Sequence, residues 1–133
     1  MNTSIGFIGL AFCGLLLAPV AAAYADPVLN ISNHPVTNLK KMSLDEVRKG
    51  IIRGGLRYKW VFEDEAPGKL KASQFEGRLS AVISITYSET DYSITLLESM
   101  GLDQKGNQIR SRYTRWIQLL TRNIDAQLQA ATL

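Results

Sequence analysis

Hydrophobic and polar residues change their spacing several times along the chain, and each change predicts an element. A capping box of Ser43 and Glu46 opens a helix expected over residues 44–53, whose apolar side chains recur at helical spacing. Gly54-Gly55 is expected to end this helix, because glycine adopts the left-handed conformation at little cost.

Alternating apolar and polar residues then predict four consecutive strands, at 56–63, 69–75, 79–87 and 92–97. Their short connections favour an antiparallel meander. A loop over 101–106 precedes a long amphipathic helix expected at 107–130. The order α-β-β-β-β-α predicts an α+β two-layer sandwich, in which a four-stranded sheet carries both helices on one face. Trp60 and Trp116 are expected in its core.

The N-terminal region has the pattern of an export signal. Its first 25 residues contain no charged side chain, and the apolar run 5–17 is followed by the small residues of Ala23-Tyr24-Ala25. This pattern predicts a signal peptide over 1–25, cleaved after Ala25, and a periplasmic mature protein. The run is short for a membrane span. Residues 26–42 are then an extended leader, and residues 43–133 a single domain.

Composition excludes several classes of function. With 46% hydrophobic and 20% charged residues the chain is typical of a globular domain, and a net charge of +3 does not identify a nucleic-acid binder. One Cys and one His exclude a disulfide framework and a histidine-rich metal cluster. Cys13 follows the bulky Phe12, which argues against lipidation, and it lies within the predicted signal peptide.

The inventory of catalytic residues is nearly empty, so we expect no enzyme and no cofactor. His34 lies in the predicted leader beside Pro35, where nothing rigid is expected to orient it. No nucleophile elbow or phosphate loop is present. The acidic cluster 63–65 lacks the spacing of an EF-hand and is interpreted as a solvated turn, so no metal site is predicted. Carboxylates that meet only in the fold leave a small envelope hydrolase as an alternative.

The most suggestive surface feature is the basic, aromatic start of the last helix. Arg110, Arg112 and Arg115 alternate there with Tyr113 and Trp116, and they are candidates for binding an anionic partner. Two basic residues of the first predicted strand, Arg57 and Lys59, are further candidates. The simpler interpretation is that these charges solvate an outer face. Export makes nucleic acid an unsuitable partner. The hydroxyl-rich open face of the sheet leaves a structural homodimer as another alternative.

Several short patterns carry a resemblance to a known family. They are Tyr58-Lys59-Trp60, Pro67-Gly68, Ile85-Thr86-Tyr87 and Tyr113-Thr114-Arg115-Trp116-Ile117. Over about residues 43–130, the chain resembles a family of small, uncharacterised bacterial periplasmic and envelope proteins, often described as lipoproteins. The resemblance implies fold and compartment, and it brings no catalytic residues. The usual lipidation cysteine is missing, which indicates a soluble periplasmic variant. Independently of this resemblance, the export pattern, the nearly empty catalytic inventory and the basic start of the last helix predict a non-catalytic binding or adaptor module for an envelope protein or for an anionic lipid or lipopolysaccharide surface.

Overall fold

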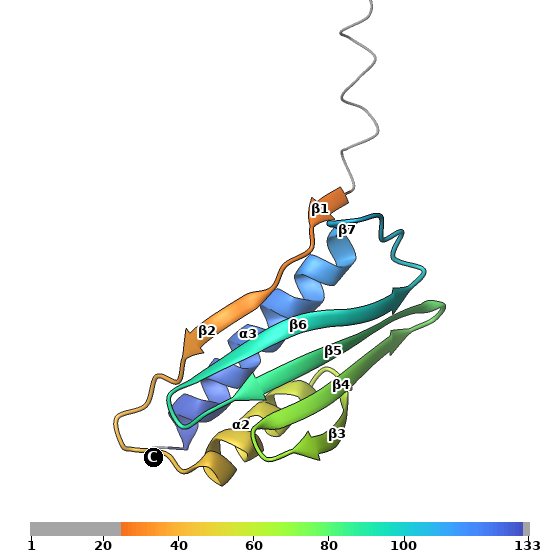
Figure 1. The fold of residues 1–133 in the computed structure, drawn as a ribbon. Coiled ribbons are helices and arrows are strands. Elements are labelled where there is room, and N and C mark those ends of the chain that lie inside the picture. The colour runs from red at the N-terminus through yellow and green to blue at the C-terminus, as the bar shows by residue number, and fades with distance from the viewer. Residues whose placement is uncertain (1–24, 132–133) are drawn as a thin grey trace, which may run out of the picture.

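The domain is α+β, with two helices packed on one face of a five-stranded antiparallel sheet (Figure 1). The computed structural model describes residues 25–131. The strand order of the large sheet is β2-β6-β5-β4-β3, and β1 and β7 form a separate two-stranded sheet. The elements are β1 (Ala25–Pro27), β2 (Ile31–Pro35), α2 (Leu44–Leu56), β3 (Val61–Ala66), β4 (Lys69–Glu76), β5 (Leu79–Tyr87), β6 (Asp91–Met100), β7 (Gln108–Arg110) and α3 (Ser111–Ala130).

The α+β class agrees with the sequence analysis, but the four-stranded meander and the α-β-β-β-β-α layout differ from the structure in detail. Residues 26–42, expected as a leader outside the domain, contribute β2, which pairs with β6 as a fifth strand. They also contribute most of β1, which pairs with β7. Two prolines and three asparagines mask any periodicity in this segment, and its strands are specified by partners distant in sequence. Apart from Ala25, the predicted signal peptide lies outside the described residues.

The first predicted strand begins too early, because α2 continues through the two glycines expected to end it. Leu56 is the last residue of the helix, and Tyr58 and Lys59 lie in the turn that follows. A Cβ atom on Gly54 would lie 2.7 Å from the backbone of α3 at Ile124. The glycine is therefore required by the close approach of two helices, and it does not terminate α2.

Two further element boundaries differ from the sequence-based expectation, because strand pairing changes where the elements begin or end. The helix expected from residue 107 begins at Ser111, because residues 108–110 form β7 against β1. Strand β6 extends to Met100, three residues beyond the expected end, and pairs with the start of β5. The turn at Pro67-Gly68 lies between β3 and β4 as expected, with Gly68 at a φ of +81°.

The core lies between the sheet and the two helices, and it confirms the expected packing of both tryptophans. Trp60 is 2% exposed and Trp116 is 7% exposed. The capping box is also confirmed, since the Ser43 side chain accepts a hydrogen bond from the Glu46 amide and the Glu46 side chain accepts one from the Ser43 amide. No helix in the described part of the chain is long and apolar enough to cross a membrane.

The N-terminal segment is fastened along the whole length of α3, and we call residues 25–42 the strap. At one end, Thr114 Oγ1 donates a hydrogen bond of 2.8 Å to Asp26 Oδ2. At the other end, Asn38 Nδ2 donates a hydrogen bond of 2.6 Å to the carbonyl oxygen of Leu128. The strap thus supplies a carboxylate near the start of α3, whose first turn has none, and a donor to a carbonyl near its end.

His34 is oriented within this strap by a contact with α3, contrary to the sequence-based expectation. Its Nε2 lies 2.8 Å from Asp125 Oδ2 on α3, and the Tyr92 hydroxyl donates a 2.8 Å hydrogen bond to the other carboxylate oxygen. Burial, with the hydrogen bond to Asp125, raises the pKa of the Tyr92 hydroxyl above its ordinary range. The three side chains tie β2, β6 and α3 together.

Candidate functional site

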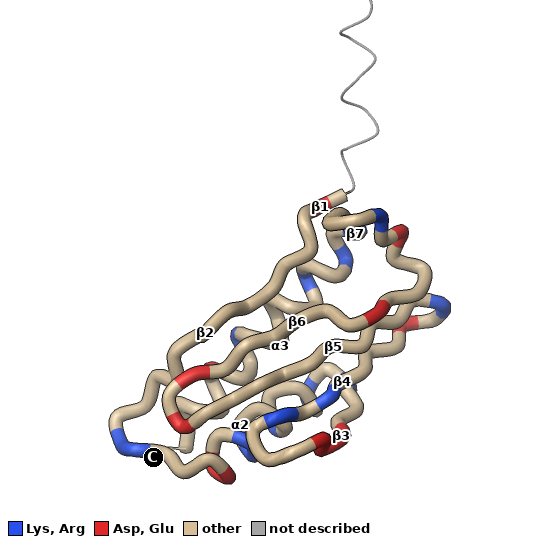
Figure 2. The backbone as a smooth tube through the Cα atoms, viewed as in Figure 1, with Lys and Arg blue, Asp and Glu red and all other residues tan. Residues whose placement is uncertain are grey.

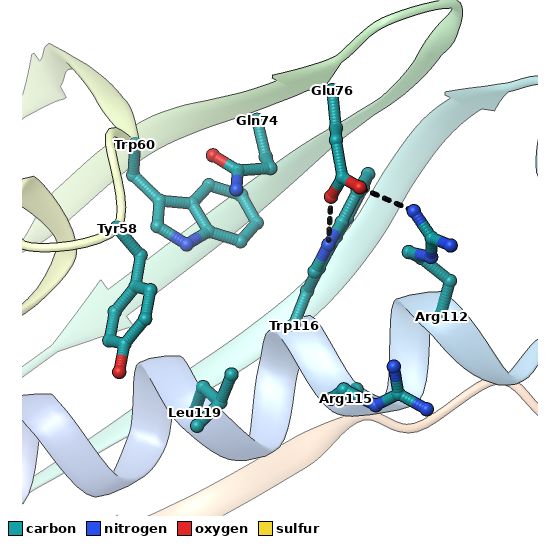
Figure 3. Close-up of a pocket in the computed structure, with 8 residues that line it drawn as sticks. All are labelled: Tyr58, Trp60, Gln74, Glu76, Arg112, Arg115, Trp116 and Leu119. Atoms are coloured by element: carbon teal, nitrogen blue, oxygen red, sulfur yellow. Dashed lines mark hydrogen bonds and ion pairs between the residues drawn. The ribbon is translucent and has the colours of Figure 1, made fainter.

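A groove of about 330 Å³ lies between α3, strand β4 and the turn that follows α2 (Figure 3). Eight side chains line it, and they include three aromatic rings, two guanidinium groups, one carboxylate and one amide. The lining residues are Tyr58, Trp60, Gln74, Glu76, Arg112, Arg115, Trp116 and Leu119. Its volume falls within the range of small ligand-binding sites.

Helix α3 supplies one wall through residues spaced at one and two turns. Arg112, Arg115, Trp116 and Leu119 stand at positions i, i+3, i+4 and i+7, so their side chains share one face of the helix. Trp116 packs into the core, while Arg115 is exposed. The helical period therefore places two cations beside an aromatic ring at the same groove.

Strand β4 supplies the polar floor of the groove. Gln74 and Glu76 continue the alternation of the buried Leu70 and Ala72, so both side chains project from the face that carries the helices. Their polar character at these positions is the sequence signal for the groove. Neither residue is among the binding candidates predicted from the sequence, because only the apolar positions of this strand indicate an inward face.

The turn over residues 57–60 supplies the third wall. The backbone amides of Tyr58 and Trp60 both donate to the carbonyl oxygen of Gly55, at 3.1 Å, which closes the chain tightly after the helix. Lys59 adopts a φ of +65° between them. Tyr58 is 40% exposed and Trp60 is almost fully buried, so the turn presents one accessible ring above a second ring in the core.

Glu76 is the central charged group of the groove, and both of its carboxylate oxygens are engaged. One accepts a hydrogen bond from the indole nitrogen of Trp116 at 3.2 Å, and the other pairs with the Arg112 guanidinium (Figure 3). These two contacts join β4 to α3 and fix the orientation of the Trp116 ring. Glu76 is also the single carboxylate among the lining residues, so the groove does not present the carboxylate pair of a glycoside hydrolase.

The guanidinium of Arg115 has no hydrogen bond or ion pair with any residue between 25 and 131. It lies at the same end of the groove as Arg112 (Figure 3). Since the charges of Glu76 and Arg112 offset one another, Arg115 leaves the groove with a net charge of +1. The positive end of the α3 dipole lies nearby, without an acidic residue of its own in the first turn.

Two of the five predicted binding residues, Arg112 and Arg115, meet in this groove. Arg110 lies outside it, at the N-cap of α3, where its side chain reaches the Gly101 carbonyl oxygen at 3.4 Å and Asp103 at 3.9 Å. Arg57 and Lys59 are exposed on either side of Tyr58 and do not line the groove. Figure 2 shows basic positions clustered around β7 and the start of α3.

Two buried polar atoms have no partner in the described structure, and one belongs to the groove. Gln74 Oε1 accepts no hydrogen bond, although the residue is only 8% exposed. The Tyr113 hydroxyl is likewise unpartnered, and burial raises its pKa above the ordinary range. Within residues 25–131, no group of three or more His, Cys, Asp or Glu side chains is arranged to hold a metal ion.

Comparisons of the chain with models of protein families, with curated proteins and with solved structures gave no match. The resemblance to small envelope proteins therefore stays a prediction.

Proposed function

We propose that this protein is a non-catalytic binding module of the bacterial periplasm, which holds an anionic group of an envelope protein or envelope component in the groove beside α3. The observation that carries the proposal is Arg115, an unpaired guanidinium at the edge of a concave, aromatic site. A cation that only solvates a helix face has no need of a cavity beside it. The export signal predicted from the sequence supports the periplasmic compartment of this proposal.

The ion pair of Glu76 and Arg112 supports the same function by shaping the site before a ligand arrives. It holds the Trp116 ring in place and removes one negative charge that would repel an anionic ligand. A site whose side chains are already fixed loses less conformational entropy on binding. The groove is therefore prepared for its ligand without rearrangement of α3.

Charge reversal at Arg115 tests this function, and α3 offers a matched control. Arg122 lies two turns further along the helix, is exposed, and does not line the groove. We expect Arg115→Glu to abolish partner binding and Arg122→Glu to preserve it, with equal melting temperatures. Arg112 is unsuitable for the test, because its reversal would also break the pair with Glu76.

The assay is cross-linking in intact cells followed by mass spectrometry, with Lys59 as the reporter because its backbone lies beside the Tyr58 wall of the groove. Recurrent cross-links from Lys59 should disappear in Arg115→Glu and persist in Arg122→Glu. The same links in both variants would show that the partner does not depend on the groove.

A structural homodimer is a second candidate, favoured by the open face of the sheet. Phe75, Ser80 and Met100 are direct neighbours across β4, β5 and β6, and Phe75 and Met100 are 65% and 70% exposed. Val61 and Leu97 add further exposed apolar surface. Apolar clusters of this kind mark interaction surfaces. A mature protein with the solution mass of a monomer at high concentration would exclude this candidate, whereas a dimer dissociated by Phe75→Lys would establish it.

A further inference from the structure

The charge of the groove limits the ligand to a small number of negative charges. Glu76 and Arg112 form a closed pair, and Arg115 is the cation left over. A carboxylate carries one negative charge and matches the planar guanidinium with two parallel hydrogen bonds. A multiply charged polymer or phosphate cluster would meet one unpaired cation in this site and would leave its other charges without partners.

Gln74, which lies beside Trp60, adds a requirement for a hydrogen-bonding group further along the groove (Figure 3). Its side chain is buried at the floor of the groove, and its carbonyl oxygen has no donor in the described structure. A primary amide contains both a donor and an acceptor, and its complement is another amide, which offers an N–H and a C=O. The ionised headgroup of a plain fatty acid has no hydrogen-bond donor, so it does not satisfy this oxygen.

The opposite end of the groove is apolar. Tyr58 and Trp60 stand there, away from the two guanidinium groups, and Leu119 projects between them and Trp116 (Figure 3). Trp60 is almost fully buried, so the accessible apolar surface belongs to Tyr58, Leu119 and the edge of Trp116. A volume of about 330 Å³ accommodates one amino-acid residue with a medium-sized apolar side chain.

These three features lie in the order in which the last residue of a peptide presents its groups. Resting on the binding function proposed above, we propose that the groove binds the free carboxyl terminus of a peptide that ends in an apolar residue. Arg115 pairs with the terminal carboxylate, the Gln74 amide pairs with the last peptide bond, and the terminal side chain packs against Tyr58. Capture of a terminal carboxylate is a recurring mode of peptide recognition.

Tryptophan fluorescence measures this binding directly, because the chain has two tryptophans and both line the groove. The purified mature protein is titrated with N-acetylated dipeptides that end in Ala, Val, Leu or Phe. Each peptide is used as the free acid, as the C-terminal amide, and as the acid with its last nitrogen methylated. We expect saturable binding of at least one free acid, and about tenfold weaker binding of its amide and of its N-methylated form.

Two variants show which side chain, Arg115 or Gln74, causes each loss of affinity. Arg115→Gln should bind the free acid and the amide equally weakly, whereas Gln74→Leu should remove the preference against the methylated nitrogen. Leucine has a shape similar to that of glutamine, and it removes a buried unpartnered oxygen, so this variant should fold. Arg122→Gln is the control, and it should bind each peptide as the parent protein does.

Separate probes distinguish failure of this inference from failure of the proposed function. N-acetylmuramic acid and vesicles of phosphatidylglycerol are titrated in parallel with the peptides. Binding of either probe that requires Arg115, without binding of any free-acid peptide, overturns the peptide ligand and keeps the anionic binding function. Equal affinity for a free acid and its amide also overturns the peptide inference. If neither the peptides nor these anionic probes bind, both proposals fail.

Discussion

Replacing Gly54 with alanine provides the sharpest test of how the two helices are joined. An added Cβ would lie 2.7 Å from both the Cα and the nitrogen of Ile124, and 3.0 Å from the carbonyl carbon of Asn123. All three are backbone atoms of α3, so no side-chain rotation relieves the clash. To reach the 3.4 Å of an ordinary contact from 2.7 Å, the helices must separate locally by about 3.4 − 2.7 = 0.7 Å.

The expected loss of stability in Gly54→Ala follows from that separation of the two helices. A gap of roughly 0.5–1 Å forfeits about a quarter to a half of the dispersion energy of each facing atom pair. Overpacking of a core typically costs about 1–3 kcal/mol, and an immovable backbone places this site at the upper end. Alanine regains about 1 kcal/mol through its higher helix propensity. We expect a net loss of about 2 kcal/mol, which corresponds to a decrease of roughly 8–16 °C in the melting temperature.

Urea denaturation followed by tryptophan fluorescence measures the loss, and Gly50 supplies the matched control. A Cβ at Gly50 would lie 2.5 Å from Cδ2 of Leu128, the far end of a flexible side chain, with its nearest backbone contact at 3.8 Å. Gly50→Ala should therefore cost much less than Gly54→Ala. An unchanged or increased stability of Gly54→Ala would refute the close approach of the helices, because propensity alone predicts stabilisation.

Further predictions concern the cap, the core and the two buried phenols. Ser43→Ala should lower the free energy of unfolding in urea denaturation by about 1 kcal/mol, and a parent-like midpoint would contradict the cap. Hydrogen bonds from Ser43 lower the pKa of Glu46, so the stabilisation from the ionised Glu46 carboxylate should be lost as the pH falls through that lowered pKa. Trp60→Ala should cost about 3–5 kcal/mol, and a loss below about 1 kcal/mol would contradict its burial. Tyr113→Phe removes an unpartnered hydroxyl, so its melting temperature should equal or exceed that of the parent. Burial raises the pKa of Tyr92, so its stabilising contribution is complete below about pH 10 and lost at higher pH; in a pH series of urea midpoints, Tyr92→Phe should flatten the alkaline decline.

The sequence correctly predicted those elements that are specified by residues close to one another in the chain. The Ser43–Glu46 capping box, the Pro67-Gly68 turn and the long alternation of β5 all have partners within a few residues, and each was found in place. Gly54 was misinterpreted for the opposite reason. Its role depends on Ile124, a residue seventy positions later, and the sequence alone does not show which helix will pack there.

Only part of the candidate site was predicted, because some of its residues are distant from the others in the sequence. Helical spacing placed Arg112 and Arg115 together, but the other polar lining residues, Gln74 and Glu76, come from a strand that only the tertiary fold brings to α3. His34 shows the same limit, because the carboxylate that orients it belongs to Asp125, 91 residues away. A search for polar residues at inward positions of predicted strands would have identified Gln74 and Glu76.

The strap has a consequence for the order in which the chain reaches its final state. Its fastening points join Asp26 to Thr114, His34 to Asp125 and Asn38 to Leu128, residues 88, 91 and 90 positions apart. The earliest part of the domain to leave the ribosome is thus secured by the part synthesised last. Until α3 has been made, the strap has no partner there, and α2 alone covers the helix-facing side of the strands. Contacts of such long sequence separation slow folding. A newly made chain therefore cannot complete its fold until its synthesis is nearly finished, which is what the export predicted from its N-terminal pattern would require.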